Sequence, residues 1–243
     1  MKPGAIERHN RTQRDYFEHT LKATMVPRAT PYVERHVDEL VACVGMTPAD
    51  RVLEVGCGMG RYTLPLVARG YQVSGMDLTQ ALLDRLREYG GGLDVPLYCA
   101  DVLNPPGELL GRFDVVCGLF TLHHLHDVPS CMGAMRRLLR PGGRIAFLEP
   151  NAWNPLYYVQ IAVTPRMTWQ GDKGVARMRK SVVLPAMREA GFTDLTVRRF
   201  GFFPPFVTNR SWGRALEGLL ERFPPWRPFL PFQLFAGRRP PRR

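Results

Sequence analysis

The chain has 243 residues, of which 45% are hydrophobic and 23% are charged, so it is long enough to bury a core and too apolar to be intrinsically disordered. Its formal net charge is +11, and residues 198–243 contain ten arginines but only two acids, Glu217 and Glu221. We interpret this basic end as a solvated tail, because prolines interrupt it and no RNA-binding motif accompanies the arginines. We therefore expect no nucleic-acid partner, whereas peripheral contact with an anionic membrane surface stays open.

The sequence has the features of a cytoplasmic protein. No apolar run approaches the ~20 residues that cross a bilayer, so we expect no transmembrane segment. The polar N-terminal sequence also lacks the apolar centre of a secretion signal. The five cysteines are odd in number and have no C-x-x-C or zinc-like spacing. We interpret them as small buried side chains in a reducing compartment and predict no metal site.

Residues 1–47 are predicted to form a helical N-terminal cap. Gly45 is expected to end its last helix, and Thr47-Pro48 marks the turn that follows. The apolar positions with helical spacing in the cap are Val33, Val37, Leu40, Val41 and Val44.

A second domain is expected over residues 48–243, where short apolar runs begin to alternate with helical segments.

From residue 51 the chain alternates between two kinds of pattern. Short apolar runs predict strands over 51–55, 71–77, 95–101, 113–120, 144–149, 193–203 and 231–239. Segments with helical spacing predict helices over 60–70, 79–89, 130–139, 182–190 and 212–222. Thr79 and Ser130 are the expected N-caps of two of these helices. Strands that alternate with helices indicate the α/β class, with a parallel sheet covered by helices on both faces.

Glycines occupy every second position of the loop after the first predicted strand, Gly56-Cys57-Gly58-Met59-Gly60. Glycine lets the backbone turn tightly and approach a ligand closely. Asp77 and Asp101 close the next two predicted strands, and Glu54 precedes the loop. Because the carboxyl ends of parallel strands meet at one edge of the sheet, we expect the three acids to surround one ligand. Asp77 is placed to accept hydrogen bonds from ribose hydroxyls.

A cationic nucleoside suits this loop better than a dinucleotide. Arg61 stands where the dinucleotide fingerprint G-x-G-x-x-G has its third glycine. A carboxylate at Glu54 also disfavours a pyrophosphate. S-adenosylmethionine carries an ammonium and a sulfonium, which suit an acid-lined glycine loop.

These motifs resemble the class I S-adenosylmethionine-dependent methyltransferases that act on small molecules. The resemblance runs from about Tyr16 to Arg238 and includes the strand-end Asp77. Its other segments are VLEVGCGMG (52–60), CAD (99–101), FDVVCGLFTLHHLHD (113–127) and LLRPGGRIAFLEPN (138–151). It implies a Rossmann-like sheet with the strand order 3-2-1-4-5-7-6 and an antiparallel last strand. It further implies methyl transfer from S-adenosylmethionine to a small-molecule acceptor, with S-adenosylhomocysteine as the product.

The resemblance also implies which residues contact the cofactor. The glycine loop would hold the methionine part, Asp77 the ribose hydroxyls, and Leu78 the adenine ring. Asp101 and the Val102 amide would bind the adenine amine, and the backbone at Leu119 the methionyl amine. The expected set is Glu54, Gly56, Cys57, Gly58, Gly60, Asp77, Leu78, Asp101, Val102, Leu119 and, folded over the cofactor from the N-terminal segment, Tyr16.

The acceptor side is less sharply defined. His123, His124 and His126 follow the strand predicted over 113–120, and a histidine near neutral pH can deprotonate a hydroxyl. His124 is the first candidate for a catalytic base and His123 the second, with a packing role as the alternative. Aromatic-rich inserts at 150–180 and 204–231 are expected to build the acceptor pocket, which favours a hydrophobic, natural-product-like acceptor.

Other functions stay open at this point. A protein of this fold could bind S-adenosylmethionine and catalyse a non-methylation reaction such as cyclisation. The basic charge also allows a membrane-lipid or an RNA methyltransferase. The N/D-P-P-Y-type motif of base methylation is replaced here by GLFTLHHL (118–125), which disfavours RNA. We expect a monomer or a homodimer.

Overall fold

The computed structural model describes residues 3–19, 25–163 and 173–241. Strands of this part of the chain form a seven-stranded sheet in the order β3-β2-β1-β4-β5-β7-β6. The first five strands pair in parallel, and β7 runs antiparallel to both β5 and β6. The predicted strand order and antiparallel last strand are thus confirmed. The strands are β1 (Arg51–Val55), β2 (Gln72–Asp77), β3 (Leu97–Cys99), β4 (Phe113–Leu119), β5 (Leu139–Pro150), β6 (Thr193–Phe200) and β7 (Phe232–Arg238).

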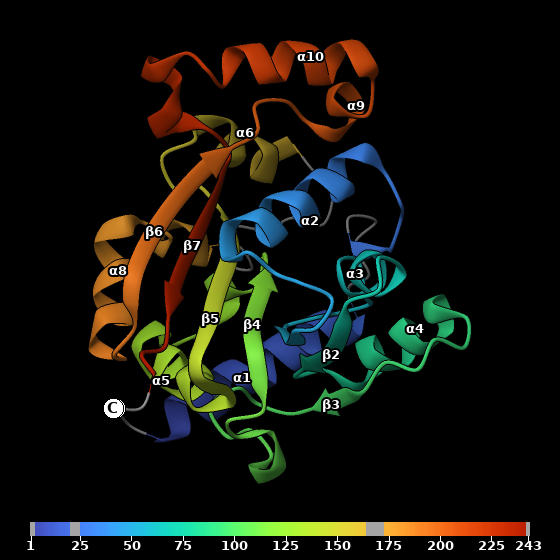
Figure 1. Cartoon of the computed structure of the whole chain (residues 1–243), viewed down its shortest axis with the longest axis vertical. Helices are drawn as coiled ribbons and strands as arrows, with labels where there is room; N and C mark the ends of the chain where they lie inside the picture. Colours follow the sequence, from blue (N-terminus) through green and yellow to red (C-terminus); the bar gives the residue numbers. More distant parts are fainter. Residues whose placement is uncertain (1–2, 20–24, 164–172, 242–243) are drawn as a thin grey trace.

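Helices lie on both faces of the sheet (Figure 1). The α-helices are α1 (Pro3–His19), α2 (Pro31–Val44), α3 (Thr63–Ala68), α4 (Gln80–Gly90), α5 (Val128–Leu138), α6 (Pro155–Val163), α8 (Lys180–Glu189), α9 (Pro205–Thr208) and α10 (Ser211–Leu220). Short 3-10 helices are η2 (Gly107–Leu109), η3 (Leu122–His124), η4 (Lys173–Arg177) and η5 (Pro224–Phe229). None of the helices in the described ranges is both long and apolar enough to cross a membrane.

Two apolar layers hold the helices against the sheet. One contains Val116 together with buried side chains of α5 and α8, and the other contains Val115 and Cys117 with side chains of α2 and α3. Neighbouring residues of β4 enter opposite layers because side chains alternate along a strand. All seven residues of β4 are buried, and after Asp114 this central strand is a continuous apolar run rather than an alternating one.

Local signals explain where several helices begin and end. Thr30 caps α2 by accepting a hydrogen bond from Val33 N, and Gly45 ends it in the left-handed region at φ 58°, as predicted. The predicted cap at Ser130 is wrong. Asp127 caps α5 instead, because its carboxylate accepts from Ser130 N and Pro129 fits the first helical turn.

Strand limits differ from the predictions by more than one residue in three places. The run at 95–101 forms only the three-residue β3, at the edge of the sheet. The run at 144–149 belongs to the longer β5, whose register with β4 shifts between Phe113 and Val115. The run at 193–203 ends as a strand at Phe200, because Gly201 turns the chain with a φ of +82°.

Candidate functional site

A cavity of about 750 Å³ lies at the carboxyl ends of β1, β2 and β4. The residues that line it come from those strand ends, from the loop after β1, from α1 and from both aromatic-rich inserts. Its volume is within the range of sites that hold small molecules. In the described ranges no group of three or more His, Cys, Asp or Glu side chains gathers in a way that could hold a metal ion.

The glycine loop folds back on the end of β2. Gly56 N donates to Met76 O over 2.7 Å, and Gly58 N donates to the Asp77 carboxylate over 2.9 Å. Gly56, Gly58 and Gly60 have φ values of 70°, 52° and 86°, which side chains rarely tolerate. The alternating glycines of the sequence are therefore required by the backbone itself.

The three glycines face different surroundings. A Cβ on Gly56 would lie 1.8 Å from Thr121 Oγ1, and a Cβ on Gly60 would lie 2.8 Å from Leu86 Cγ. A Cβ on Gly58 would meet no atom within 4 Å. Gly58 thus leaves open space at the cavity wall. Gly60 is not among the residues that line the cavity, and packing against α4 accounts for it.

The predicted acids do converge on the cavity. Glu54 Oε2 accepts from the Thr63 hydroxyl over 2.6 Å. Asp77 accepts from Thr79 N over 3.0 Å in addition to Gly58 N. Asp101 accepts from Leu103 N over 2.9 Å and from the Asn10 side chain of α1 over 2.6 Å. The other predicted cofactor residues that line the cavity are Gly56, Cys57, Gly58, Leu78, Val102 and Leu119.

Burial changes the chemistry of two of these acids. Removal from water raises the pKa of Glu54 to about 8. Burial also raises the pKa of Asp77, while the N–H groups of Gly58 and Thr79 act in the opposite direction. A carboxyl group with a raised pKa gains charge when a cation binds beside it. The Glu54 side of the cavity is therefore suited to a positively charged group.

The raised pKa of Glu54 predicts a pH dependence of stability for the ligand-free chain. The pKa of Glu54 is near 4.5 in the unfolded chain and about 8 in the folded one. The stability that the neutral Glu54 side chain contributes to the folded state is therefore fully present below pH about 4.5 and is lost as the pH rises through about 8. Glu54→Gln should thus lose less stability than the wild type between pH about 5 and about 8. Thermal unfolding at both pH values tests this, with the exposed Glu108→Gln as the control. If the stability of Glu54→Gln fell with rising pH as steeply as that of the wild type, Glu54 would not be the group that causes the pH dependence.

Helix α1 covers the cavity with different residues from the one predicted. Asn10, Gln13 and Phe17 line the cavity, but Tyr16 is not among the lining residues. Tyr16 instead packs edge-on against Phe17, with ring centroids 5.1 Å apart. The residue that the resemblance places over the cofactor is thus one position away from the aromatic ring that faces the cavity.

The three histidines differ in how they are held, although all of them line the cavity. His123 is only 4% exposed, and its Nδ1 lies 2.6 Å from Glu149 Oε2. The other oxygen of Glu149 accepts from Thr121 N and Leu122 N, which fixes the carboxylate. His124 packs edge-on against Phe17. A carboxylate thus orients His123, which favours it over His124 as a base.

Sequence patterns missed an aromatic group that also lines the cavity. His36 of α2 is buried at the centre of this group, with Nδ1 3.1 Å from the Tyr62 hydroxyl, and burial lowers its pKa well below the usual value. No residue spacing could have revealed this group, because its members come from distant elements. The members that line the cavity are Tyr32, Tyr62, Phe120 and Phe232.

The aromatic-rich inserts divide into two groups. Tyr157 and Phe206 of the inserts line the cavity, together with Leu156 and Val159 of α6 and with Phe202 and Phe203, which directly precede the second insert. The aromatic residues that are 45–61% exposed and do not line it are Trp153, Trp212, Phe223, Trp226 and Phe229. Residues 164–172 of the first insert, Trp169 included, lie outside the described residues.

Comparison with known proteins agrees with this geometry. Residues 53–147 match a family model described as a methyltransferase domain. A ubiquinone biosynthesis O-methyltransferase from Idiomarina loihiensis is 32% identical over 179 residues, which are 71% of this chain and 71% of that protein.

Solved structures share the fold at lower identity. Geranyl diphosphate C-methyltransferase from Streptomyces coelicolor, in complex with geranyl diphosphate and S-adenosylhomocysteine, superposes with a TM-score of 0.62 at 18% identity, covering 95% of this chain and 98% of that chain. The [4+2]-cyclase SpnF superposes with a TM-score of 0.59 at 20% identity, covering 86% of this chain and 82% of that chain.

Proposed function

Since this chain belongs to the class I S-adenosylmethionine-dependent methyltransferases, we propose that its acceptor is a small, mainly apolar molecule that is methylated on a hydroxyl group. One observation carries the proposal: the histidine that Glu149 orients, His123, lines a cavity that aromatic side chains line as well. An apolar wall binds an apolar body without leaving polar groups unpaired. A histidine is needed only where the attacking atom carries a proton that must be removed.

The residues present fit the methyl donor. When bound, S-adenosylmethionine supplies an electrophilic methyl group on a cationic sulfur. Gly58 leaves space at the cavity wall. Glu54, at the end of β1 before the glycine loop, offers a buried carboxyl group to a positive charge. Asp77 retains acceptor capacity for ribose hydroxyls, because a carboxylate has about four lone-pair sites and two of them take Gly58 N and Thr79 N. Asp101 and Leu78 would hold the adenine.

In the proposed mechanism His123 takes the proton of the acceptor hydroxyl. Glu149 accepts the hydrogen of Nδ1, so Nε2 is the nitrogen that can receive this proton. The deprotonated oxygen would then be able to attack the methyl group that bound S-adenosylmethionine supplies, with S-adenosylhomocysteine as the leaving group. Glu149 is a positioning residue: it fixes the tautomer of His123 and stabilises the charged ring. The proximity and orientation of the two substrates supply the remaining rate enhancement.

The names of similar proteins support both parts of the acceptor assignment. The relative from Idiomarina loihiensis is an O-methyltransferase, which agrees with a hydroxyl acceptor. It is named for ubiquinone biosynthesis, and the Streptomyces coelicolor enzyme is named for geranyl diphosphate. We take from these names only that the acceptor is a biosynthetic small molecule with an apolar portion.

The function can be tested by measuring product formation with purified protein. The chain is incubated with S-adenosylmethionine and a set of phenols with apolar side chains, and S-adenosylhomocysteine is quantified. We expect release that depends on the phenol and is absent with matched methyl ethers, which lack the hydroxyl. Conversion of an acceptor without S-adenosylhomocysteine release would identify a non-methylation reaction such as cyclisation and overturn the proposal.

Replacement of Asp77 by alanine is expected to weaken S-adenosylhomocysteine binding. Loss of a charged hydrogen-bond acceptor costs about 1.5–3 kcal/mol, which is roughly a ten- to hundredfold loss of affinity. The loss also frees Gly58 N and so loosens the glycine loop. Isothermal titration calorimetry measures the affinity, and Asp84→Ala, which removes an exposed acid of α4, is the matched control. Equal affinities for Asp77→Ala and the wild type would exclude this role of Asp77.

A further inference from the structure

Helix α10 carries its large apolar residues on the outside of the molecule. Trp212, Leu216, Leu219 and Phe223 recur at helical spacing along α10 and the turn after it, and they are 40–64% exposed. Glu217, on another side of the helix, is buried. Surface helices ordinarily turn their apolar side toward the core and their charges toward water. We call these four apolar residues the outer stripe of α10.

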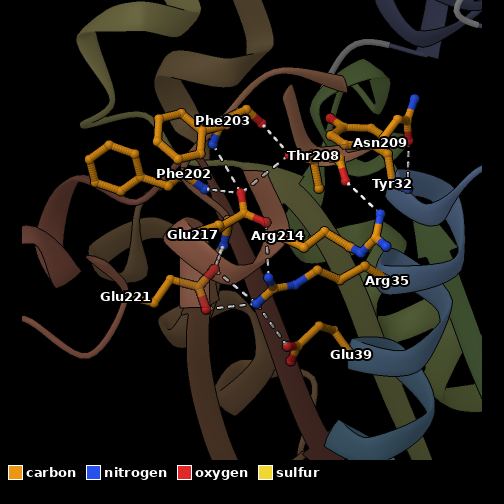
Figure 2. A network of polar contacts seen from close by, with 11 residues as sticks. Tyr32, Arg35, Glu39, Phe202, Phe203, Thr208, Asn209, Arg214, Glu217 and Glu221 are labelled. Atoms are coloured by element: carbon orange, nitrogen blue, oxygen red, sulfur yellow. Dashed lines mark hydrogen bonds and ion pairs between the residues drawn. The ribbon is translucent and has the colours of Figure 1, made fainter. Parts of the chain in front are cut away.

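Ion pairs fix α10 in this orientation (Figure 2). Glu217 accepts from Arg35 of α2 over 2.9 Å and from the backbone N–H groups of Phe202 and Phe203 over 2.7 and 3.0 Å. Glu221 accepts from Arg35 over 2.6 Å as well. Rotation of the outer stripe into the protein would break these buried contacts. The exposure of the stripe is therefore a property of the fold.

The charges that α10 and its neighbours leave at the surface are positive. The only acids in residues 202–230 are Glu217 and Glu221, and both of them point toward Arg35. The arginines of the same segment, all of them exposed, are Arg210, Arg214, Arg222 and Arg227. The outer stripe is thus accompanied by arginines without exposed acids, and it complements a negatively charged partner.

The apolar surface continues to the mouth of the cavity. Phe206 of α9 is 76% exposed and also lines the cavity, and Leu156 and Val159 of α6 do the same. Trp226 and Phe229 of η5, which follows α10, are about half exposed. Helices α6, α9 and α10 all lie at the upper end of the molecule in Figure 1. The cavity therefore opens among exposed apolar residues at the same end as the outer stripe.

We propose that the outer stripe of α10 docks on an anionic phospholipid bilayer surface, with the cavity mouth turned toward the membrane. Trp, Phe and Leu on one side of a helix with arginines nearby are the composition of helices that lie in the membrane interface. Exposed apolar patches rimmed by charge mark interaction sites, and the uniform positive sign selects the anionic lipid. The bilayer would then supply the apolar acceptor. This last step rests on the proposed function, whereas the docking is independent of it.

Vesicle flotation tests the docking directly. The full chain is mixed with vesicles of phosphatidylcholine alone or of phosphatidylcholine with phosphatidylglycerol. We expect flotation with the anionic vesicles, little with the neutral ones, and weaker binding as salt is added. Arg222→Gln with Arg227→Gln should lower the partition coefficient by roughly 30-fold, because each arginine near an anionic surface is worth about 1 kcal/mol.

Substitutions on the outer stripe distinguish binding through this surface from nonspecific hydrophobic adsorption to the vesicles. A Trp212→Ser, Leu216→Ser, Leu219→Ser variant should lose flotation but retain S-adenosylhomocysteine binding by calorimetry. A Leu93→Ser, Leu110→Ser variant removes exposed apolar residues elsewhere and should float like the wild type.

Three results would overturn the proposal. They are no flotation of the wild type with anionic vesicles, equal flotation of the outer-stripe variant, and a homodimer that the outer-stripe variant abolishes while no vesicle binding is seen. The last of these would make the surface an interface between copies of the chain. Flotation without any methyl transfer would leave the docking proposal standing and contradict the proposed function alone.

Discussion

His123→Ala is expected to lower the turnover number by about 10²–10⁴-fold while S-adenosylhomocysteine affinity stays within a few-fold of the wild type. The reason is geometric: His123 is buried at the cavity wall, and Glu149 fixes its ring nitrogen Nδ1. The measurement is steady-state methyl transfer to the best phenol found in the product-release assay. Added imidazole should restore part of the rate if a missing base is the defect.

Two further variants show whether the pair acts as proposed. Glu149→Gln would place an amide group where the carboxylate now accepts, so His123 would lose the tautomer that leaves Nε2 free. We expect turnover to fall by at least about 10²-fold. His124→Ala is the matched control, because it removes a neighbouring ring from the same cavity wall. Normal turnover in His123→Ala would show that proximity alone, or a different base, drives the reaction.

Arg35→Met is expected to destabilise the folded protein by about 3–5 kcal/mol. The Arg35 guanidinium is the partner of Glu217, whose side chain is 2% exposed, and removal of one member of a buried ion pair leaves an uncompensated charge. Urea unfolding at neutral pH measures the free energy change. Arg69→Met, which breaks ion pairs with the more exposed Glu34 and Asp38, should cost less than about 1 kcal/mol.

A second substitution at the same contact tests whether the lost pairing with Glu217 causes the destabilisation of Arg35→Met. The Arg35→Met, Glu217→Gln double variant removes both charges, so its loss should be clearly smaller than the sum of the two single losses. Additive losses would mean that Arg35 stabilises the protein through Glu221, Glu39 or the packing of its side chain rather than through Glu217.

Most of the sheet could be predicted because the local residue patterns and the overall strand arrangement agree there. The glycine loop, the strand-end acids Glu54, Asp77 and Asp101, and the apolar runs all require the same parallel arrangement, and the structure brings the three acids to one cavity. Errors are at the ends of elements, where one polar side chain decides. Asp127 rather than Ser130 caps α5 because two residues of similar propensity compete within one turn.

The contacts that define the acceptor side could not be predicted. The pairing of His123 in η3 with Glu149 in β5 joins residues 26 positions apart, and no spacing rule encodes it. The apolar spacing of α10 predicts a helix but not its rotation, since periodicity is the same whether the stripe faces the core or water. Long-range contacts decide that rotation, above all the contact between Glu217 and Arg35, which are 182 positions apart.

The position of β7 determines when the sheet can be completed during synthesis. Strand β6 joins the sheet only through β7, and β7 lies between β5 and β6. Residues 232–238 must therefore leave the ribosome before either β5 or β6 gains its antiparallel partner. Until then the edge of β5 is open to pairing with other chains, which is the usual route to aggregation of nascent sheets. The nascent chain thus exposes an unpaired edge of β5 until β7 has been made.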